Sequence, residues 1–221
     1  MPNKAIREEF NNELKSLLHE IEVMGKTVAK SVREATEALL TGNTVLAQKV
    51  INGDDTIDLM QTVIEDKCIL LIALQQPLAR DLRILTTALK IVTDLERIGD
   101  YADNIARLSL KKMQGYDVSS KYGDFKPMAQ EVAFMIENVI EAYINVDICS
   151  AEEIHKHDDV VDAYCKKMHD EILLNIQATA DNVDRLTGIL AILHYLERAG
   201  DHVTNIAEWV IFLSTGRRYK V

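Results

Sequence analysis

Hydrophobic residues recur every three or four positions along most of the chain, with few helix-breaking residues between them. The pattern is interrupted at residues 41–44, 75–77, 115–127, 146–150 and 178–182. The segments between these breaks run for about 23 to 38 residues and are rich in good helix formers. Helices of this length are typical of bundles. The pattern therefore predicts an all-α protein with three long antiparallel helices, a linker and three more.

The two halves of the sequence resemble each other. Residues 95–106 read LERIGDYADNIA and residues 196–207 read LERAGDHVTNIA, so that eight of the twelve aligned positions are identical. In the same way, DDTID at residues 54–58 matches DDVVD at residues 158–162. An internal repeat of this kind indicates a duplicated structural unit. We predict two tandem three-helix bundles, the first over residues 1–115 and the second over residues 124–216.

Four pairs of acidic residues, each four positions apart, are the most informative feature. The pairs are Asp54 with Asp58, Glu96 with Asp100, Asp158 with Asp162, and Glu197 with Asp201. Residues at this spacing share one face of a helix, where two like charges repel. In each helix the acids continue a row of apolar residues, which indicates that they face a neighbouring helix. Asp159, next to Asp158, leaves the register of the third pair open by one residue.

Antiparallel hairpins would bring these pairs to the same height. In the first hairpin, 54 with 100 and 58 with 96 both average 77, a position inside the expected turn. In the second, 158 with 201 and 162 with 197 both average 179.5, again inside a turn. Each hairpin thus groups four carboxylates, and a multivalent cation would offset their repulsion. Oxygen ligands alone suit Mg, Mn, Ca or ferric iron. The alternative is solvated surface charge, or pairing with Lys and Arg.

Other residues give weaker indications of a site. His194 lies one turn from Glu197, but its counterpart in the first half is Thr93, so a ligand role is not favoured. Cys165 and His169 continue the acid row of their helix, and core or surface roles are favoured for them. No pairing of a nucleophile with a base, phosphate-binding glycine loop or nucleic-acid motif is visible.

Charge and composition narrow the class of protein. The chain has 35 acidic and 25 basic residues and a net charge of −10, which disfavours duplex DNA or anionic lipid as a main partner. No apolar run is long enough to span a membrane, and the first residues lack the apolar segment of a secretory signal. The three cysteines have no CxxC spacing, as expected of reduced thiols. A cytoplasmic protein is therefore expected.

With these motifs the sequence resembles the PhoU family of bacterial phosphate-signalling proteins. The resemblance spans nearly the whole chain and is carried by QPLARDLR at 76–83, ALKIVTDLERIGD at 88–100, YLERAGDHVTNIAE at 195–208 and LSTG at 213–216. It implies two three-helix bundles with multinuclear clusters of divalent or trivalent metal ions, namely Fe, Mn, Mg or Zn. Carried over to this chain, one cluster would use Asp54, Asp58, Glu96 and Asp100, and the other Asp158, Asp162, Glu197 and Asp201.

The resemblance also implies a regulatory role. PhoU-like proteins repress the phosphate-starvation response by linking the ATPase subunit of the phosphate ABC transporter to a membrane-bound sensor histidine kinase. A non-enzymatic, metal-binding adapter is therefore expected, homodimeric and cytoplasmic, and held at the inner membrane face by protein partners. Neither nucleic-acid binding nor membrane insertion is expected. The alternative is a multinuclear metal-dependent phosphohydrolase, because clustered carboxylates also support two-metal chemistry.

Overall fold

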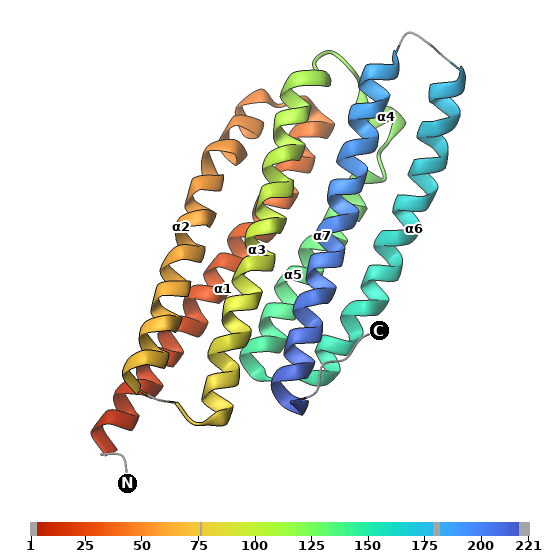
Figure 1. Ribbon diagram of the computed structural model, residues 1–221. Coiled ribbons are helices and arrows are strands. Elements are labelled where there is room, and N and C mark those ends of the chain that lie inside the picture. The colour runs from red at the N-terminus through yellow and green to blue at the C-terminus, as the bar shows by residue number, and fades with distance from the viewer. Residues whose placement is uncertain (1–3, 76, 179–181, 217–221) are drawn as a thin grey trace.

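The computed structural model describes residues 4–75, 77–178 and 182–216. Within these ranges the chain forms six long helices and one short one. The long helices are α1 (Lys4–Thr41), α2 (Thr44–Gln75), α3 (Ala79–Lys112), α5 (Phe125–Asn145), α6 (Ile148–Ala178) and α7 (Val183–Thr215). The prediction of an all-α protein with six long antiparallel helices is confirmed (Figure 1).

The linker between the halves contains a helix that the hydrophobic pattern did not predict, α4 (Val118–Lys121). The Asp117 side chain caps it by accepting a hydrogen bond from the backbone N–H of Ser120 at 3.0 Å. Val118 and Tyr122 are buried, and the helix packs against α1. A helix of four residues is too short to show a helical period, so the sequence pattern carries no signal for it.

The long helices form two three-helix bundles that lie side by side (Figure 1). Helices α1, α2 and α3 pack against one another, as do α5, α6 and α7, and the bundles meet where α1 lies against α5 and α3 against α7. In the described part of the chain, α2 and α6 each contact only helices of their own bundle. They are the outer helices of the molecule. We call the line where α2 meets α3 the first seam, and the line where α6 meets α7 the second seam.

The hydrophobic core continues through both bundles and does not depend on the acidic residues. In α1, Leu17, Ile21 and Met24 follow one another at steps of three or four residues and are completely buried. In α3, Leu95 and Ile98 are equally buried, although they flank the acids of the same helix. Each fully buried side chain of this size stabilises the fold by about 1.5–3 kcal/mol. The apolar rows therefore hold the bundles together while the acids occupy a neighbouring face.

Helices α3 and α7 meet through contacts that the internal repeat makes nearly symmetric. His202 Nδ1 lies 2.8 Å from Asp94 Oδ1, and His202 Nε2 lies 3.3 Å from the Tyr101 hydroxyl. Tyr195 stacks on Tyr101 with ring centroids 5.7 Å apart. The numbers 94 with 202 and 101 with 195 both average 148. This pairing is expected where two antiparallel copies of one helix meet across a two-fold axis.

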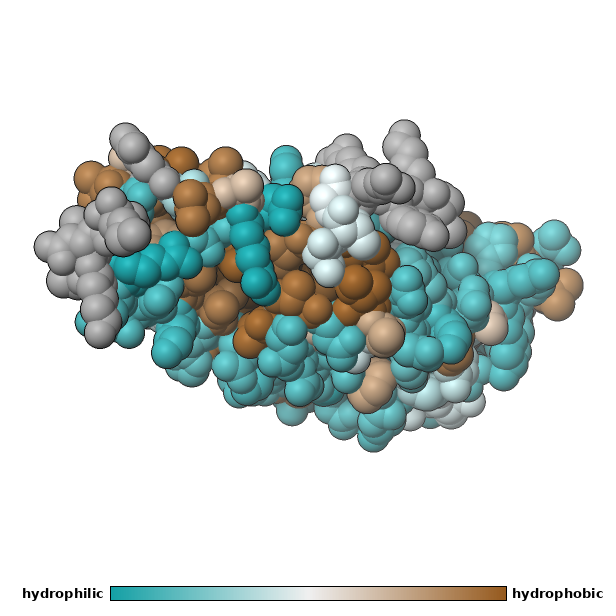
Figure 2. All heavy atoms as spheres, turned by 90° about the horizontal axis from the view of Figure 1, so that it is seen from below, coloured by the Kyte–Doolittle hydropathy of each residue, from teal (hydrophilic) through white to brown (hydrophobic). Residues whose placement is uncertain are grey.

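Exposed hydrophobic side chains are found where α2 turns into α3, at the end of the molecule seen in Figure 2. Leu74 and Leu78 flank this turn and are 69% and 74% exposed. Figure 2 shows apolar side chains gathered between polar ones on this face. Among the described residues, no helix is both long and apolar enough to cross a membrane.

Candidate metal centres

The predicted acids lie where a buried apolar row of each hairpin reaches the surface. In α3, Val92 is completely buried, whereas the Glu96 side chain one turn further on is 18% exposed. In α7, Leu193 is completely buried and the Glu197 side chain one turn further on is 35% exposed. Among the eight acids, five are half-buried, namely Asp54, Glu96, Asp100, Asp158 and Glu197, and three are exposed, namely Asp58, Asp162 and Asp201. Each seam therefore combines partly desolvated carboxylates with ones that solvent reaches freely.

In the first seam the structure brings the acids of α2 and α3 within range of one another's charge. Burial, followed by the negative charges of Asp103, Asp58 and Asp100, raises the pKa of Asp54 to about 6. The pKa of Glu96 is raised as well, first by burial and then by Asp100. Partial desolvation and like charge both favour the protonated form of a carboxyl group. The four predicted side chains of this seam form one interacting cluster.

Asp103 adds a fifth carboxylate to the first seam. It is 8% exposed, and its Oδ2 accepts a hydrogen bond from Arg107 Nε at 2.5 Å. Its Oδ1 is buried and has no hydrogen-bond partner, which is costly for a carboxylate oxygen. Asp103 lies three residues after Asp100 in the same row, but the second copy has Thr204 there. The match between the halves therefore does not point to it.

The second seam shows the same mutual repulsion. Burial, with the charges of Asp162 and Asp201, raises the pKa of Asp158 to about 6. The pKa values of Asp162 and Asp201 are also raised, in both cases by burial and then by Glu197. The four acids predicted for this hairpin therefore also form one electrostatic cluster.

A glycine in each copy of the LERxGD motif lets the acid-bearing helices approach closely. A Cβ atom on Gly200 would lie 2.8 Å from Asp158 Oδ1. A Cβ atom on Gly99 would lie 3.8 Å from Asp54 Oδ1 and 3.1 Å from another α2 side chain. Asp158 thus lies directly against the backbone of α7, whereas Asp159 is exposed. The sequence left open whether Asp158 or Asp159 belongs to the acid row of α6. In the structure, Asp158 is the residue that faces the seam.

Arginine offsets part of the charge in the first seam. Arg97 Nη1 donates a hydrogen bond to Asp100 Oδ2 at 3.1 Å, and Arg97 Nε lies 3.5 Å from Glu96 Oε2. The Arg97 side chain is 54% exposed, and such solvated pairs contribute about 0–1 kcal/mol. The sequence left open the alternative that the acids pair with Lys and Arg, and Arg97 does pair with Glu96 and Asp100. Because these contacts are weak, the repulsion between the two carboxylates stays largely in place.

The second seam also contains ligand-type side chains that the sequence did not favour. Donor atoms of Cys165, His194 and Glu197 all lie within 4.8 Å of one another. In the described part of the chain, no other three His, Cys, Asp or Glu side chains are this close, so the predicted acids are more widely spaced. The sequence does contain a signal for this pair. Residues 165 and 194 average 179.5, as the acid pairs of this hairpin do, which places them at the same height.

The surroundings of Cys165 are strongly acidic. Burial raises the pKa of its thiol to about 12, with contributions from the charge of Glu197, a hydrogen bond to Glu197 and the charges of Asp162 and Asp201. His194 Nδ1 lies 2.9 Å from Glu197 Oε2. A cation placed here would meet a thiol, an imidazole and carboxylates together. The donor set of the first seam is oxygen alone, which fits hard cations, and that of the second is mixed.

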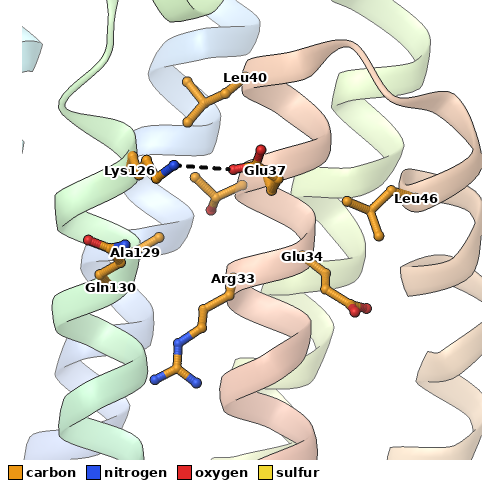
Figure 3. Close-up of a pocket in the computed structure, with 9 residues that line it drawn as sticks. Arg33, Glu34, Glu37, Leu40, Leu46, Lys126, Ala129 and Gln130 are labelled. Carbon is orange, nitrogen blue, oxygen red and sulfur yellow. Dashed lines mark ion pairs between the residues drawn. The ribbon is translucent and has the colours of Figure 1, made fainter.

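A separate pocket of about 340 Å³ lies between α1 and α5 (Figure 3). Lys126 and Glu37 approach each other across it, with their charged atoms 3.8 Å apart. Arg33 also lines the pocket, but its guanidinium group donates two hydrogen bonds to Glu137 at 2.7 and 2.8 Å. Both basic side chains are paired with carboxylates, so the pocket does not select an ion by charge, and it includes none of the predicted acids.

Two copies of a three-helix bundle, each with four acids along the seam of one hairpin, define a duplicated all-α protein with two acidic seams. The family model described as the PhoU domain matches residues 21–109 and 125–210. The chain belongs to the PhoU family, as the sequence motifs predicted. The predicted bundle boundaries at residues 115 and 124 stay a prediction.

Similar proteins match the chain over nearly its whole length. The phosphate-specific transport system accessory protein PhoU homolog of Clostridium acetobutylicum is 38% identical, over 96% of this chain and 97% of that protein. The homolog from Pseudomonas aeruginosa is 33% identical, over 96% and 87%. The crystal structure of PhoU from Pseudomonas aeruginosa superposes with a TM-score of 0.88 at 33% identity, covering 94% of this chain and 100% of that one. The phosphate transport system regulatory protein PhoU from Streptococcus pneumoniae gives 0.87 at 27% identity, covering 96% and 100%. The predicted fold of two tandem bundles is confirmed.

Proposed function

We propose that the chain is an accessory protein of phosphate-specific transport and a negative regulator of the phosphate-starvation response. The observation that carries this proposal is the match to relatives named as accessory proteins of that transport system, which spans 96% of the chain. The Streptococcus pneumoniae relative is named as a regulatory protein of phosphate transport. These names describe accessory and regulatory proteins, which supports a non-enzymatic role.

The proposed mode of action is that of an adapter between two proteins. One partner is the ATPase subunit of the phosphate ABC transporter, and the other is a phosphate-sensing histidine kinase. The fold supports simultaneous contacts, because α2 and α6 are outer helices of different bundles. In this proposal the protein is cytoplasmic and homodimeric, and only its partners hold it at the membrane, since its net charge of −10 opposes binding to anionic lipid.

The adapter is proposed to hold metal ions in both seams. The ligands are Asp54, Asp58, Glu96 and Asp100 in the first seam, and Asp158, Asp162, Glu197 and Asp201 in the second. The raised pKa values of Asp54 and Asp158 reflect repulsion and desolvation that a cation would relieve. The buried, unpaired Oδ1 of Asp103 is a further oxygen donor in the first seam. Fe, Mn, Mg and Zn all accept carboxylate ligands.

Deleting the gene tests the regulatory role. Phosphate-starvation genes are expected to be expressed in phosphate-rich medium when the protein is absent, and unchanged expression would contradict the proposal. In cell fractions the protein is expected to sediment with membranes only when the transporter or the kinase is present. Binding to protein-free anionic vesicles at physiological salt would contradict the dependence on protein partners.

The clustered carboxylates also make a metal-dependent phosphohydrolase the second candidate, because two metal ions held about 3.5–4 Å apart stabilise phosphoryl transfer. Metal-loaded protein should therefore be incubated with phosphoester substrates. An adapter gives no turnover above the metal-only control. Turnover that the Asp100→Ala substitution abolishes would overturn the non-enzymatic assignment.

A further inference from the structure

Helices α6 and α7 bring a second kind of ligand to the second seam, one level beyond the acids. On α6, Cys165 follows Asp162 by three residues, so both side chains lie on one helix face. On α7, His194 precedes Glu197 by three residues. The pairs 162 with 197 and 165 with 194 share the average 179.5, which places them at successive heights of one hairpin.

The three side chains meet where the buried core of the second bundle reaches the surface. Cys165 is 6% exposed and supplies its sulfur from the buried side of the seam. The His194 side chain is 46% exposed and approaches from the solvent side, with Nδ1 held 2.9 Å from Glu197 Oε2. All three donor atoms lie within 4.8 Å of one another, so one ion between them would be in reach of each.

We propose that Cys165, His194 and Glu197 form a binding site for a borderline transition-metal ion of the Zn²⁺ class. Thiolate, imidazole and carboxylate are the three ligand types that Zn²⁺ takes in proteins, and Mg²⁺ or Ca²⁺ would not select a thiol. Binding replaces the thiol proton by the metal, and the proton leaves to solvent. This inference deepens the proposed metal-binding function, on which it rests through the shared Glu197.

Three protein ligands leave one position of a tetrahedral ion open. His169 lies one turn along α6 from Cys165, and its ring centroid is 6.0 Å from that of His194. Its imidazole is the candidate fourth ligand on that side of the site, and water is the alternative occupant. His169→Asn is therefore expected to change the geometry of the bound ion while leaving the ion in place.

The first seam lacks this site. Gln61 and Thr93 stand at the positions of Cys165 and His194, and 61 and 93 average 77, as the acid pairs of that hairpin do. Neither an amide nor a threonine hydroxyl competes with thiolate and imidazole for Zn²⁺. The two seams are therefore expected to prefer different metals, hard oxygen-seeking ions in the first and a Zn²⁺-class ion in the second.

Titration of the metal-free, full-length protein with Co²⁺, a spectroscopic substitute for Zn²⁺, tests the site. Wild-type protein is expected to develop a thiolate-to-cobalt charge-transfer band that stoichiometric Zn²⁺ removes. Cys165→Ser should abolish the band, and His194→Thr should weaken Co²⁺ binding at least about tenfold. Cys149→Ser is the matched control, because this exposed thiol lies on the same helix and outside the site. It should leave the band unchanged.

A gain-of-function variant keeps the test decisive if Cys165→Ser is poorly folded. Gln61→Cys combined with Thr93→His should create a second cobalt–thiolate band in the first seam. Wild-type protein that binds Mn²⁺ but gives no such band overturns this inference and leaves the proposed acid clusters standing. Wild-type protein that gives the cobalt–thiolate band but binds no Mn²⁺ supports the site of Cys165, His194 and Glu197, and contradicts the proposed acid clusters. A band that survives Cys165→Ser, or that disappears in Cys149→Ser, also overturns the inference.

Discussion

The two seams share one carboxylate arrangement and differ in what surrounds it. In the first seam the neighbours are oxygen and nitrogen groups, namely Asp103 with its Arg107 partner and the exposed Arg97. In the second seam they are a thiol and an imidazole, those of Cys165 and His194. The acids match pairwise between the halves, and Arg97 has the counterpart Arg198. Asp103, Arg107, Cys165 and His194 have no counterpart of their own type in the other half.

The comparison shows which parts of the site the helical geometry fixes. The offset between the halves is 104 residues for Asp54 and Asp158 but 101 for Glu96 and Glu197, so the second hairpin is three residues shorter at its turn. Each turn still lies midway between its own acids, which keeps the acids of each hairpin level. Side chains about one helical turn from the acids, such as Cys165 and His194, are not required to keep the acids level. They are therefore free to set the metal preference of each seam.

Removing two acids from one seam should have the largest effect. Glu96→Ala combined with Asp100→Ala is expected to remove about half of the bound metal, because the two seams have equivalent sets of carboxylates. The matched variant, Glu197→Ala with Asp201→Ala, should remove the other half. Elemental analysis of protein purified without chelators or an affinity tag measures both. Loss of all metal from either variant would show that the seams do not bind independently.

Chelation should lower the melting temperature without unfolding the chain. An ion at 100 times its dissociation constant stabilises the folded state by about 2.7 kcal/mol, or about 5–10 °C for a protein of this size. Helicity should persist, because Leu95, Ile98 and the other buried rows do not involve the acids. Calorimetry and circular dichroism with and without chelator test this. Equal melting temperatures would contradict metal binding by the seams.

How far the sequence predicts the molecule depends on the length of each feature. The long helices and the duplicated acids repeat a pattern many times. The sequence alone therefore predicted the six helices, the family and the grouping of four acids in each hairpin. The short helix α4 depends on local packing and leaves no periodic signal. Asp103 continues the row of Glu96 and Asp100, but the burial of its Oδ1 depends on local packing. Cys165 and His194 were discounted because the first half lacks them, although their heights in the hairpin agree.

The pH dependence of metal-free stability is a smaller effect. The ordinary pKa of Asp54 and Asp158 is 3.8, and in the folded protein it is about 6. Both carboxyls therefore bind protons more tightly when folded, so their contribution to stability is complete below about pH 4 and is lost as the pH rises through about 6. Asp54→Asn, which stays uncharged, should be more stable than wild type above pH 6, and the difference should vanish near pH 4.

Urea denaturation of the metal-free proteins at a series of pH values measures this difference. Asp55→Asn is the matched control, since this neighbouring carboxyl is exposed. An Asp54→Asn variant with the pH profile of the wild type would show that the first seam does not shift the titration of Asp54. In the presence of metal, the pH dependence of stability should have the opposite sign, because protons and cations compete for the same carboxylate oxygens. Metal binding should therefore weaken as the pH falls through about 6.

The smallest expected effect separates the seams through their glycines. Gly99→Ala places a Cβ 3.1 Å from Ile57 Cδ1 and 3.2 Å from Ile57 Cγ2, so Ile57 must shift by a few tenths of an ångström. The gain in helix propensity, about 1 kcal/mol, offsets this cost.

Gly200→Ala places a Cβ 2.8 Å from Asp158 Oδ1, so the carboxylate itself must turn away from its position in the cluster. We expect the free energy of unfolding of both variants, measured by urea denaturation, to stay within about 1 kcal/mol of wild type. Mn²⁺ affinity should fall a few-fold in the second seam of Gly200→Ala and stay unchanged in the first seam of Gly99→Ala. The opposite order would show that the close approach of α6 to α7 does not position Asp158.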